Sequence, residues 1–389
     1  MNLNELVSKY ESEIIEIRNH IHQYPEVGFE EIQTSQTVMN FLDKVGIPYV
    51  KGIAKTGVLA TIVGDKPGKT VLLRADMDAL AMDEDPGNPI VSKIAGRMHA
   101  CGHDGHTAGL LLAGALLFEM KSELRGTVKL MFQPAEETVG GALPMIEEGV
   151  LEGVDMAFGC HLWGSALEGT AGYKYGAMMA APDEFKITVT GKGGHGAYPQ
   201  STIDPIVAGA QIVTAIQSIV SRNVNPLESA VVTIATFHSG SAFNIISNEA
   251  IMTGTIRTLS EENRERVARR LKEIAMHVAS AYGAEAVVEV IRKYPVLVNA
   301  DAAVDVAKGA FAKILGDQNV SEIPVPSMGG EDFAYIAQHV PSAFVYVGIA
   351  QNIDKPISHH HPEFQWDDKN IAILGKGLAQ CAIDFLNND

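Results

Sequence analysis

The sequence has few cysteines, a shortage of positive charge and no long apolar run. Three cysteines among 389 residues cannot build a disulfide framework, so we expect the chain to work in the reducing cytoplasm with its thiols free to bind metal. Lysine and arginine number 30 against 47 acidic residues, which argues against nucleic acid or an anionic membrane as a partner. The longest apolar run, Leu110 to Phe118, is too short to span a membrane. The first residues, Met1 to Glu13, lack the basic start and apolar stretch of a signal peptide.

The length of the chain and its 46% apolar content suit two domains with filled cores. In the first part, predicted strands alternate with predicted helices, which favours an α/β layer with a mostly parallel sheet. The helices are Glu5 to His22 and Thr107 to Met120, and the strands are Val58 to Val63, Thr70 to Arg74, Thr127 to Phe132 and Asp155 to Cys160.

The order of predicted elements changes near Asp183 to strand, helix, strand, strand, helix, strand, which is typical of a ferredoxin-like unit. The predicted elements are Phe185 to Thr190, Asp204 to Ser221, Ala230 to Phe237, Glu249 to Arg257, a helix capped by Ser260 that runs to Tyr282, and Glu285 to Arg292. The α/β alternation then returns with a helix at Ala302 to Leu315, a strand at Ala343 to Val347 and a helix at Lys369 to Leu386. We therefore predict one domain made of residues 1–182 and 294–389, with a second domain, residues 183–293, inserted in it.

Four segments place acids, His or Cys where open α/β sheets build their sites. Cys101 and His103 sit in a glycine-bearing loop before the apolar helix, and both are common ligands of borderline-soft metals. Glu136 and Glu137 follow an apolar strand, and neighbouring side chains leave the backbone in different directions. One can therefore bind a metal while the other acts as a general base. Taken alone, the first pair also fits a core Cys beside a capping His, and the second fits a solvated acidic loop.

The other two segments are histidines near the ends of predicted strands. His161 closes the apolar strand that ends at Cys160, and alone it also fits a satisfied core histidine. A triple histidine at 359–361 precedes a proline, and alone it also fits a surface tract. Jointly the four segments are more specific, because two ions roughly 3.5–4 Å apart need several ligands, one of them bridging.

Seven motifs in this order resemble the aminoacylase and amidohydrolase branch of the dinuclear metal-dependent carboxypeptidase and deacylase family, and bacterial L-aminoacylases above all. The likeness covers almost the whole chain. The motifs are His22-Gln-Tyr-Pro-Glu26, Arg74-Ala-Asp-Met-Asp-Ala-Leu80, His99-Ala-Cys-Gly-His-Asp-Gly-His-Thr107, Phe132-Gln-Pro-Ala-Glu-Glu137, Gly191-Lys-Gly-Gly-His-Gly-Ala197, Gly254-Thr-Ile-Arg-Thr258 and Gly329-Gly-Glu-Asp-Phe333. The resemblance implies a zinc-exopeptidase-like catalytic domain and a lid that also serves as a dimerisation surface.

The resemblance also implies roles for particular residues. It implies two divalent metal ions, most readily zinc, with manganese, cobalt or nickel as alternatives. Cys101 would bridge them, His103 and His161 would complete one site, Glu137 and His360 would complete the other, and Glu136 would be the general base. The choice of His360 within the triple histidine rests on the family pattern alone, and His361 is the alternative. Arg74 stands where more distant branches place a metal-binding His, which His103 replaces here.

In the lid, the resemblance implies that His195 polarises the scissile carbonyl, reaching across a homodimer into the partner's site. Asn244 and Arg257 match positions that hold the substrate, and Arg257 would bind the carboxylate of the substrate. Ala81 and Ser247 replace prolines common in the family, which leaves the substrate open.

The expected activity is metal-dependent hydrolysis of the amide bond of an N-acetyl or N-aroyl amino acid. Within that class, a carboxypeptidase, a dipeptidase and an N-acetyl-diaminopimelate deacetylase are alternatives. A cysteine hydrolase with Cys101 as nucleophile, and His103 or His106 as base, is a different chemistry that leaves the carboxylates and the triple histidine unexplained. A metal carrier or scaffold without turnover is a third alternative, against which the intact Glu136 argues.

Overall fold

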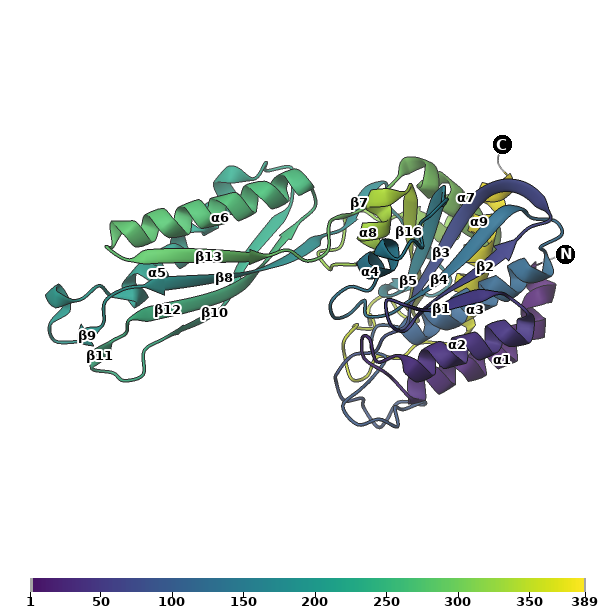
Figure 1. Ribbon diagram of the computed structural model, residues 1–389, viewed down its shortest axis with the longest axis horizontal. Helices are drawn as coiled ribbons and strands as arrows, with labels where there is room; N and C mark the ends of the chain where they lie inside the picture. The colour runs from purple at the N-terminus through teal and green to yellow at the C-terminus, as the bar shows by residue number, and fades with distance from the viewer. Residues whose placement is uncertain (1–2, 388–389) are drawn as a thin grey trace. The chain divides into compact units, whose positions relative to one another are not determined.

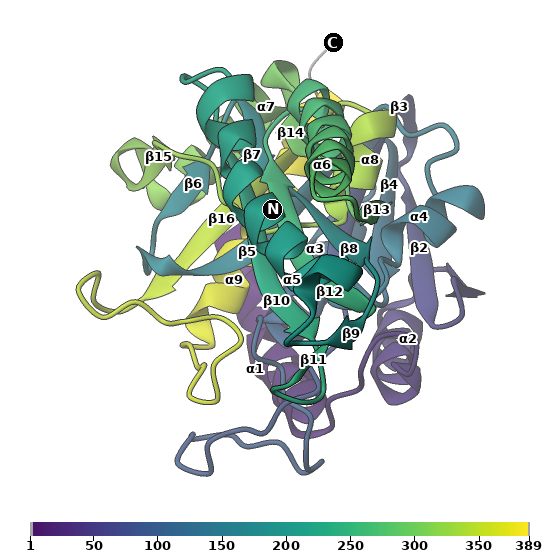
Figure 2. The same cartoon turned by 90° about the vertical axis from the view of Figure 1, so that its left-hand side faces the viewer.

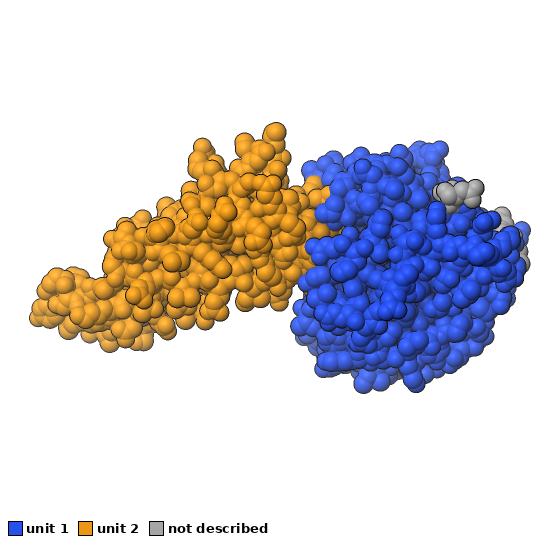
Figure 3. Space-filling model, turned by 45° about the horizontal axis from the view of Figure 1, so that its top comes forward, with its two compact units in different colours: residues 1–176, 298–325, 332–389 blue, residues 177–297, 326–331 orange. Residues whose placement is uncertain are grey.

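The computed structural model describes residues 3–387, and the chain folds as two compact units (Figure 3). Unit 1 comprises Met1–Gly176, Val298–Val325 and Asp332–Asp389, and unit 2 comprises Ala177–Leu297 and Pro326–Glu331. No helix among residues 3–387 is both long and apolar enough to cross a membrane.

Unit 1 is built on an eight-stranded sheet in the order β1-β2-β4-β3-β5-β16-β6-β15 (Figures 1 and 2). The strands are β1 (Tyr49–Ile53), β2 (Gly57–Val63), β3 (Lys66–Asp76), β4 (Arg125–Gln133), β5 (Met156–Leu167), β6 (Ala171–Tyr173), β15 (Val320–Glu322) and β16 (Ser342–Ala350). The four central strands β4, β3, β5 and β16 run parallel, whereas β1, β2 and β6 pair antiparallel with their neighbours β2, β4 and β16. The sheet is therefore mixed, and the expected parallel arrangement holds for its centre.

The helices of unit 1 are α1 (Leu3–Gln23), α2 (Ile32–Val45), α3 (His103–Glu119), α4 (Ala142–Glu147), α7 (Asp301–Leu315), α8 (Phe333–His339) and α9 (Lys369–Asn387), with a 3₁₀ turn η3 (Asp317–Asn319). Helix α3 is apolar on all sides and is packed between α1, α9 and the sheet. A Cβ atom on Gly109 of α3 would lie 2.4 Å from Leu374 of α9. Glycine at this position therefore allows the close approach of the two helices that buries α3.

Two expected boundaries in unit 1 were wrong, and both concern site residues. Helix α3 begins at His103 rather than at Thr107, because Gly102, with φ of 92°, supplies the left-handed turn before it. His103 is therefore on the first turn of a helix and not in a loop. Strand β5 continues to Leu167 instead of ending at Cys160, so His161 lies within a strand. The alternation along β5 buries Cys160 in the core, as expected for a small core residue.

Unit 2 has an antiparallel sheet in the order β10-β12-β8-β13, with α5 and α6 packed together against it (Figures 1 and 2). Its elements are β8 (Ala181–Thr190), α5 (Pro205–Ala215), β10 (Ala230–Ser239), β12 (Glu249–Thr258), α6 (Glu261–Ala281) and β13 (Glu285–Ile291), which is the expected ferredoxin-like order. The Ser260 side chain caps α6 by accepting a hydrogen bond from the Asn263 N–H at 3.3 Å.

One helix of unit 2 is shorter than expected. Helix α5 ends at Ala215, and a short π-helix, η2 (Ile219–Asn223), follows where the sequence predicted a single helix to Ser221.

The remaining elements are short. They are η1 (Pro199–Ser201), β9 (Gly194–His195), β11 (Ile245–Ile246), and β7 (Gly176–Met179) and β14 (Leu297–Asn299) where the chain passes between the units.

Candidate metal centre

All five expected metal ligands converge in unit 1, although they come from distant parts of the sequence. Cys101 and His103 stand at the start of α3, His161 is in β5, Glu137 follows β4, and His360 lies in the loop after β16. Their donor atoms form two groups in which all atoms lie within 4.8 Å of one another. Cys101 belongs to both groups, so its sulfur is the atom that the two groups share.

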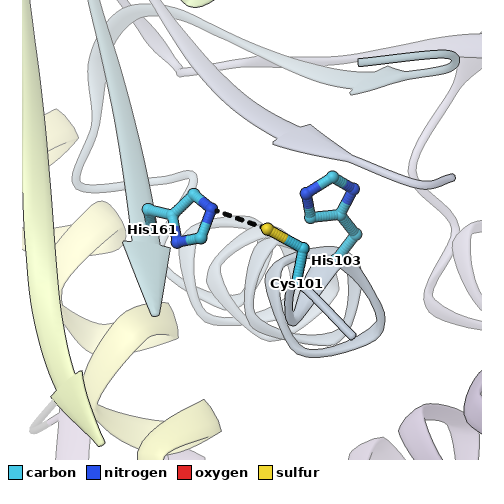
Figure 4. A group of neighbouring side chains, drawn as sticks. All are labelled: Cys101, His103 and His161. Carbon is cyan, nitrogen blue, oxygen red and sulfur yellow. Dashed lines mark hydrogen bonds between the residues drawn. The ribbon is translucent and has the colours of Figure 1, made fainter. Parts of the chain in front are cut away.

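The first group, Cys101, His103 and His161, is fully buried. The two imidazoles lie on either side of the sulfur atom in Figure 4, and the thiol donates to His161 Nε2 over 3.4 Å. The Nδ1–H of His161 donates to the Leu162 carbonyl at 2.7 Å, which fixes the ring and leaves Nε2 as the nitrogen that faces the sulfur.

The second group, Cys101, Glu137 and His360, is more open to solvent. His360 Nε2 donates to Glu137 Oε1 at 3.1 Å, and the His360 side chain is 51% exposed. His103 links the two groups, because its Nε2 lies 3.8 Å from the same Glu137 oxygen. Each group thus offers three donors. Catalytic zinc sites have three protein ligands, whereas structural zinc sites have four.

Among the described residues, His360 is the member of the triple histidine whose ring nitrogen lies in one of the two donor groups. His359 donates from Nε2 to the Leu162 carbonyl at 2.9 Å, and His361 accepts the Glu363 N–H on Nδ1 at 3.2 Å. His360 is the member whose ring faces Glu137. Its backbone is in the left-handed region at φ of 57°, and its N–H donates to the Ala100 carbonyl at 2.9 Å.

The sequence did not single out Asp76, which lies beside the cluster. Asp76 accepts from His106 Nδ1 at 2.6 Å and from buried Arg74 at 2.7 Å. His106 also accepts the Leu162 N–H on Nε2 at 2.9 Å, so both of its ring nitrogens are already bonded and it is not a free donor. A strand end in the Arg74-Ala-Asp-Met-Asp motif was the available signal for this carboxylate.

The charges of the cluster favour cations. Burial and then the Glu137 and Glu136 carboxylates raise the pKa of the Cys101 thiol well above its ordinary value. Burial disfavours a charge on His103, but Asp76, Asp78 and Glu137 outweigh it and raise the His103 pKa to about 10. The Cys101 thiol and the His103 ring therefore hold protons when no metal is bound, and a bound metal ion would replace them. The donor set, one thiol with imidazoles and carboxylates, fits two borderline-soft divalent ions.

Glu136, the expected base, lies within the same region. It is buried, and one of its oxygens lies within 4.8 Å of donor atoms of His103 and Glu137. Its backbone N–H donates to Asp78 Oδ1 at 3.0 Å, and the Glu137 N–H donates to Asp78 Oδ2 at 2.9 Å. The backbone N–H groups of both glutamates are therefore held by one buried aspartate.

The other three expected site residues belong to unit 2. His195 in β9 pairs with Ile245 in β11, and the Gly196 N–H donates to the Asn244 carbonyl at 2.9 Å. His195 and Asn244 are thus neighbours on one two-stranded ribbon. Arg257 is on a different strand, β12, and its guanidinium donates to the Ile256 carbonyl at 3.1 Å.

Residues 72–383 match the family model described as Peptidase family M20/M25/M40. The chain is 41% identical over 383 residues to N-acetyl-L-cysteine deacetylase of Bacillus subtilis, covering 98% of this chain and 90% of that protein. It is 40% identical over 386 residues to thermostable carboxypeptidase 1 of Saccharolobus solfataricus, covering 98% and 97%. A solved dinuclear metal binding peptidase of the M20 family from Bacillus subtilis superposes with a TM-score of 0.87 at 34% identity, covering 98% and 99%.

These matches confirm the expected family, the α/β fold class and the expected class of enzyme, a hydrolase of amide bonds. The chain belongs to peptidase family M20/M25/M40.

Proposed function

We propose that the protein hydrolyses the amide bond of an N-acyl amino acid, such as an N-acetyl or N-aroyl amino acid, with two divalent ions bound in unit 1. The observation that carries the proposal is the sharing of one sulfur by two donor groups. Cys101 lies within 4.8 Å of His103 and His161 on one side and of Glu137 and His360 on the other. A buried carboxylate, Glu136, stands beside both groups. The deacetylase name of the Bacillus subtilis relative supports an N-acyl amino acid as substrate.

In this proposal Cys101 would be a ligand of both ions, with His103 and His161 as the other ligands in the buried group and Glu137 and His360 as those in the open group. Zinc suits thiolate and imidazole donors best, and manganese, cobalt or nickel are alternatives. When bound, such ions supply Lewis acidity and lower the pKa of a water molecule. The carboxylates and the thiol balance the added positive charge.

Glu136 is the general base in the proposed reaction. It takes a proton from the attacking water and returns it to the nitrogen of the leaving amine, so that one carboxylate serves both steps. Its adjacent residue, Glu137, points to His360, which leaves the two side chains with separate tasks. The Cys101 thiol is not the nucleophile in this scheme, because its position between donor groups makes it a ligand.

The lid residues are assigned to the substrate. We propose that His195 donates to the oxyanion that forms at the acyl carbon, from the lid of a second copy in a homodimer. Asn244, beside it on the β9–β11 ribbon, would orient the amide, and Arg257 would bind the carboxylate of the amino acid. The inserted residues 183–293 act in this proposal as lid and dimerisation domain.

We also propose the cytoplasm as the site of action. The three cysteines are free and buried, and a reducing compartment keeps the proposed bridging thiol from being oxidised.

The test is a panel of N-acetyl and N-aroyl amino acids, N-acetyl-diaminopimelate and dipeptides, assayed on protein loaded with zinc, manganese, cobalt or nickel. A chelator should abolish hydrolysis, and readdition of the ion should restore it. A cysteine hydrolase would instead survive the chelator. Absence of hydrolysis across the panel with every ion would contradict the proposal.

Carboxypeptidase activity is a second candidate, favoured by the name of the Saccharolobus solfataricus relative. The two candidates differ in the group on the acyl side of the scissile bond, which is a simple acyl group in one and an aminoacyl or peptidyl group in the other. A higher kcat/KM for dipeptides than for the N-acetyl derivative of the same amino acid would select the carboxypeptidase.

A further inference from the structure

The turn that carries the two glutamates, residues 134–137, has an unfavourable backbone. Ala135 lies in the left-handed region at φ of 59°, where an L-residue with a Cβ atom is seldom found. The Gly140 N–H donates to the Ala135 carbonyl at 3.0 Å and closes the turn on its C-terminal side. Such a conformation persists only where neighbouring groups determine it.

Two buried carboxylates hold three consecutive N–H groups of this turn. Glu31 Oε1 accepts from the Ala135 N–H at 2.9 Å. The two oxygens of Asp78 accept from the next two N–H groups, those of Glu136 and Glu137, at 3.0 and 2.9 Å. Both acceptors are fully buried, Glu31 at 0% and Asp78 at 1% exposure.

Each of these carboxylates is itself anchored to another part of unit 1. Glu31 is the residue before α2, and its second oxygen accepts from the Thr56 hydroxyl at 2.6 Å. Asp78 follows β3, and its Oδ1 lies 3.3 Å from His103 Nδ1. Asp78 thus contacts both glutamates of the turn and a second proposed metal ligand, His103, beside Glu137.

The segment that carries Glu31 also packs directly against the turn. A Cβ atom on Gly28 would lie 2.3 Å from Thr138 Oγ1 and 3.0 Å from the Cα of Ala135. No side chain larger than hydrogen fits there, so the chain before α2 is pressed against the turn.

We propose that Glu31 and Asp78 act as a carboxylate clamp, a pair of positioning residues that aims Glu136 toward its proton and Glu137 toward the open donor group. The buried carboxylate oxygens accept from three consecutive N–H groups, and with these three groups fixed the two side chains leave the turn in set directions. The role in hydrolysis rests on the proposed function. The role in metal binding follows from the contact of the clamp with Glu137 and His103 and is tested separately.

The decisive substitution is Asp78→Asn in the full-length protein. An asparagine offers one acceptor oxygen, so its amide NH₂ would face one of the two N–H groups that Asp78 now satisfies. With Co²⁺ as the probe, we expect a shifted thiolate-to-cobalt absorption band and weaker Co²⁺ binding. With zinc and an N-acetyl amino acid, we expect kcat to fall on the order of 10²-fold with KM within about threefold, because misplacement of the base affects the chemical step.

Glu31 supplies a pair of variants that separates charge from hydrogen bonding. Glu31→Gln keeps an acceptor for the Ala135 N–H, and its amide can donate to the Thr56 hydroxyl, so it should rescue most of what Glu31→Ala loses. Adding Ala135→Gly to Glu31→Ala should also recover part of kcat, because glycine adopts the left-handed conformation without strain. These variants decide the matter if Asp78→Asn fails to fold.

Glu148→Ala is the matched control. Glu148 Oε1 accepts the N–H of Ala54 at 2.8 Å, and Ala54 is also left-handed, at φ of 45°. The Glu148→Ala variant should leave kcat and the cobalt spectrum unchanged. An unaltered cobalt spectrum and kcat in both Asp78→Asn and Glu31→Ala would overturn the clamp, as would equal losses in Glu31→Gln and Glu31→Ala. If the unaltered protein binds Co²⁺ but hydrolyses no substrate in the panel, the proposed function fails, while the cobalt spectra still test the clamp.

Discussion

Both units bury carboxylates, but they balance the buried charge in different ways. In unit 2, Asp183 is fully buried and accepts from Arg264 at 2.6 and 2.8 Å, from Arg292 at 2.8 Å and from the Lys293 N–H at 3.0 Å. In unit 1, the acidic side chains of the cluster around the Cys101 sulfur outnumber the basic side chains that could balance their charge. These acids are Asp76, Asp78, Glu136 and Glu137, and the buried guanidinium nearby, that of Arg74, is shared between Asp76 and Asp332.

The difference separates a structural role from a functional one. A buried carboxylate with its own guanidinium partners needs nothing from outside the chain, and it fixes the end of β8 against α6. A cluster with surplus acid stays neutral only by retaining protons or by binding cations. Loss of a metal ligand should therefore affect metal content and activity, whereas loss of Asp183 should affect only stability.

The largest effect is expected for His161→Ala. Loss of one donor from the buried group should remove an ion and lower kcat/KM on the order of 10³-fold, since metal stabilisation of the transition state is worth several kcal/mol. Metal analysis beside initial rates measures both. Cys160→Ala is the control, because this neighbour in β5 is buried in the core instead. Retention of both ions by His161→Ala would contradict the assignment.

The next effect is expected for Asp183→Asn in unit 2. Removal of the charge takes from buried Arg264 its buried carboxylate partner and leaves only the half-exposed Glu261. Loss of one member of a buried ion pair destabilises by about 3–5 kcal/mol in comparable cases. Hydrogen exchange of peptides from β8 and α6 should quicken, while metal content stays unchanged. Glu184→Gln, at an exposed adjacent position, should change neither. Metal loss in Asp183→Asn would break the separation between the two units.

The sequence predicted elements best where one strong pattern decided them. The all-apolar α3 and the capped α6 were found, because continuous burial and a Ser260 cap with acids behind it leave marks on local sequence. Helix α2 was missed, and its N-terminal N–H groups are capped from outside by Glu26, which accepts from Gln33 at 3.1 Å and Thr34 at 2.9 Å. That cap comes from a residue outside the helix, so local sequence does not show it.

The site residues also divide into those that the sequence predicted and those that depend on contacts made only in the fold. The five donors were predicted because Cys, His and Glu are common metal ligands and because the family resemblance chose among them, and the structure brings them together. Glu31 and Asp78 were not singled out, since their role depends on which N–H groups the fold brings to them. The turn at Ala135 was missed as well, because alanine gives no sign of a left-handed backbone.

Removal of the ions should affect one unit only. Ligand binding at about 100 times Kd stabilises a folded state by about 2.7 kcal/mol, so chelation should speed hydrogen exchange around residues 99–106 and 134–137 in unit 1. Peptides from β8 and α6 in unit 2 should exchange at the same rate with and without metal. Equal acceleration in both units would show that their stabilities are coupled and would weaken the comparison.

The smallest effect is the pH dependence of unit 2. Burial opposes the charge of Asp183, but bonds from Arg264, the Lys293 N–H and Arg292 outweigh it and hold the Asp183 pKa below its ordinary value. The unfolded chain therefore binds the proton first as pH falls, so this contribution to stability is complete above about pH 4 and is lost as pH falls through the lowered pKa. The ratio of the exchange rates of β8 peptides in Asp183→Asn and in the unaltered protein, taken at the same pH so that the intrinsic exchange rate cancels, should be constant from about pH 5 to about pH 7 and shrink below about pH 4. An effect of Asp183→Asn on exchange that instead shrank as pH rose would mean that the arginines do not hold Asp183 ionised. Unit 2 would then no longer be an example of a buried carboxylate whose charge is balanced within the chain, in contrast to the acidic cluster of unit 1.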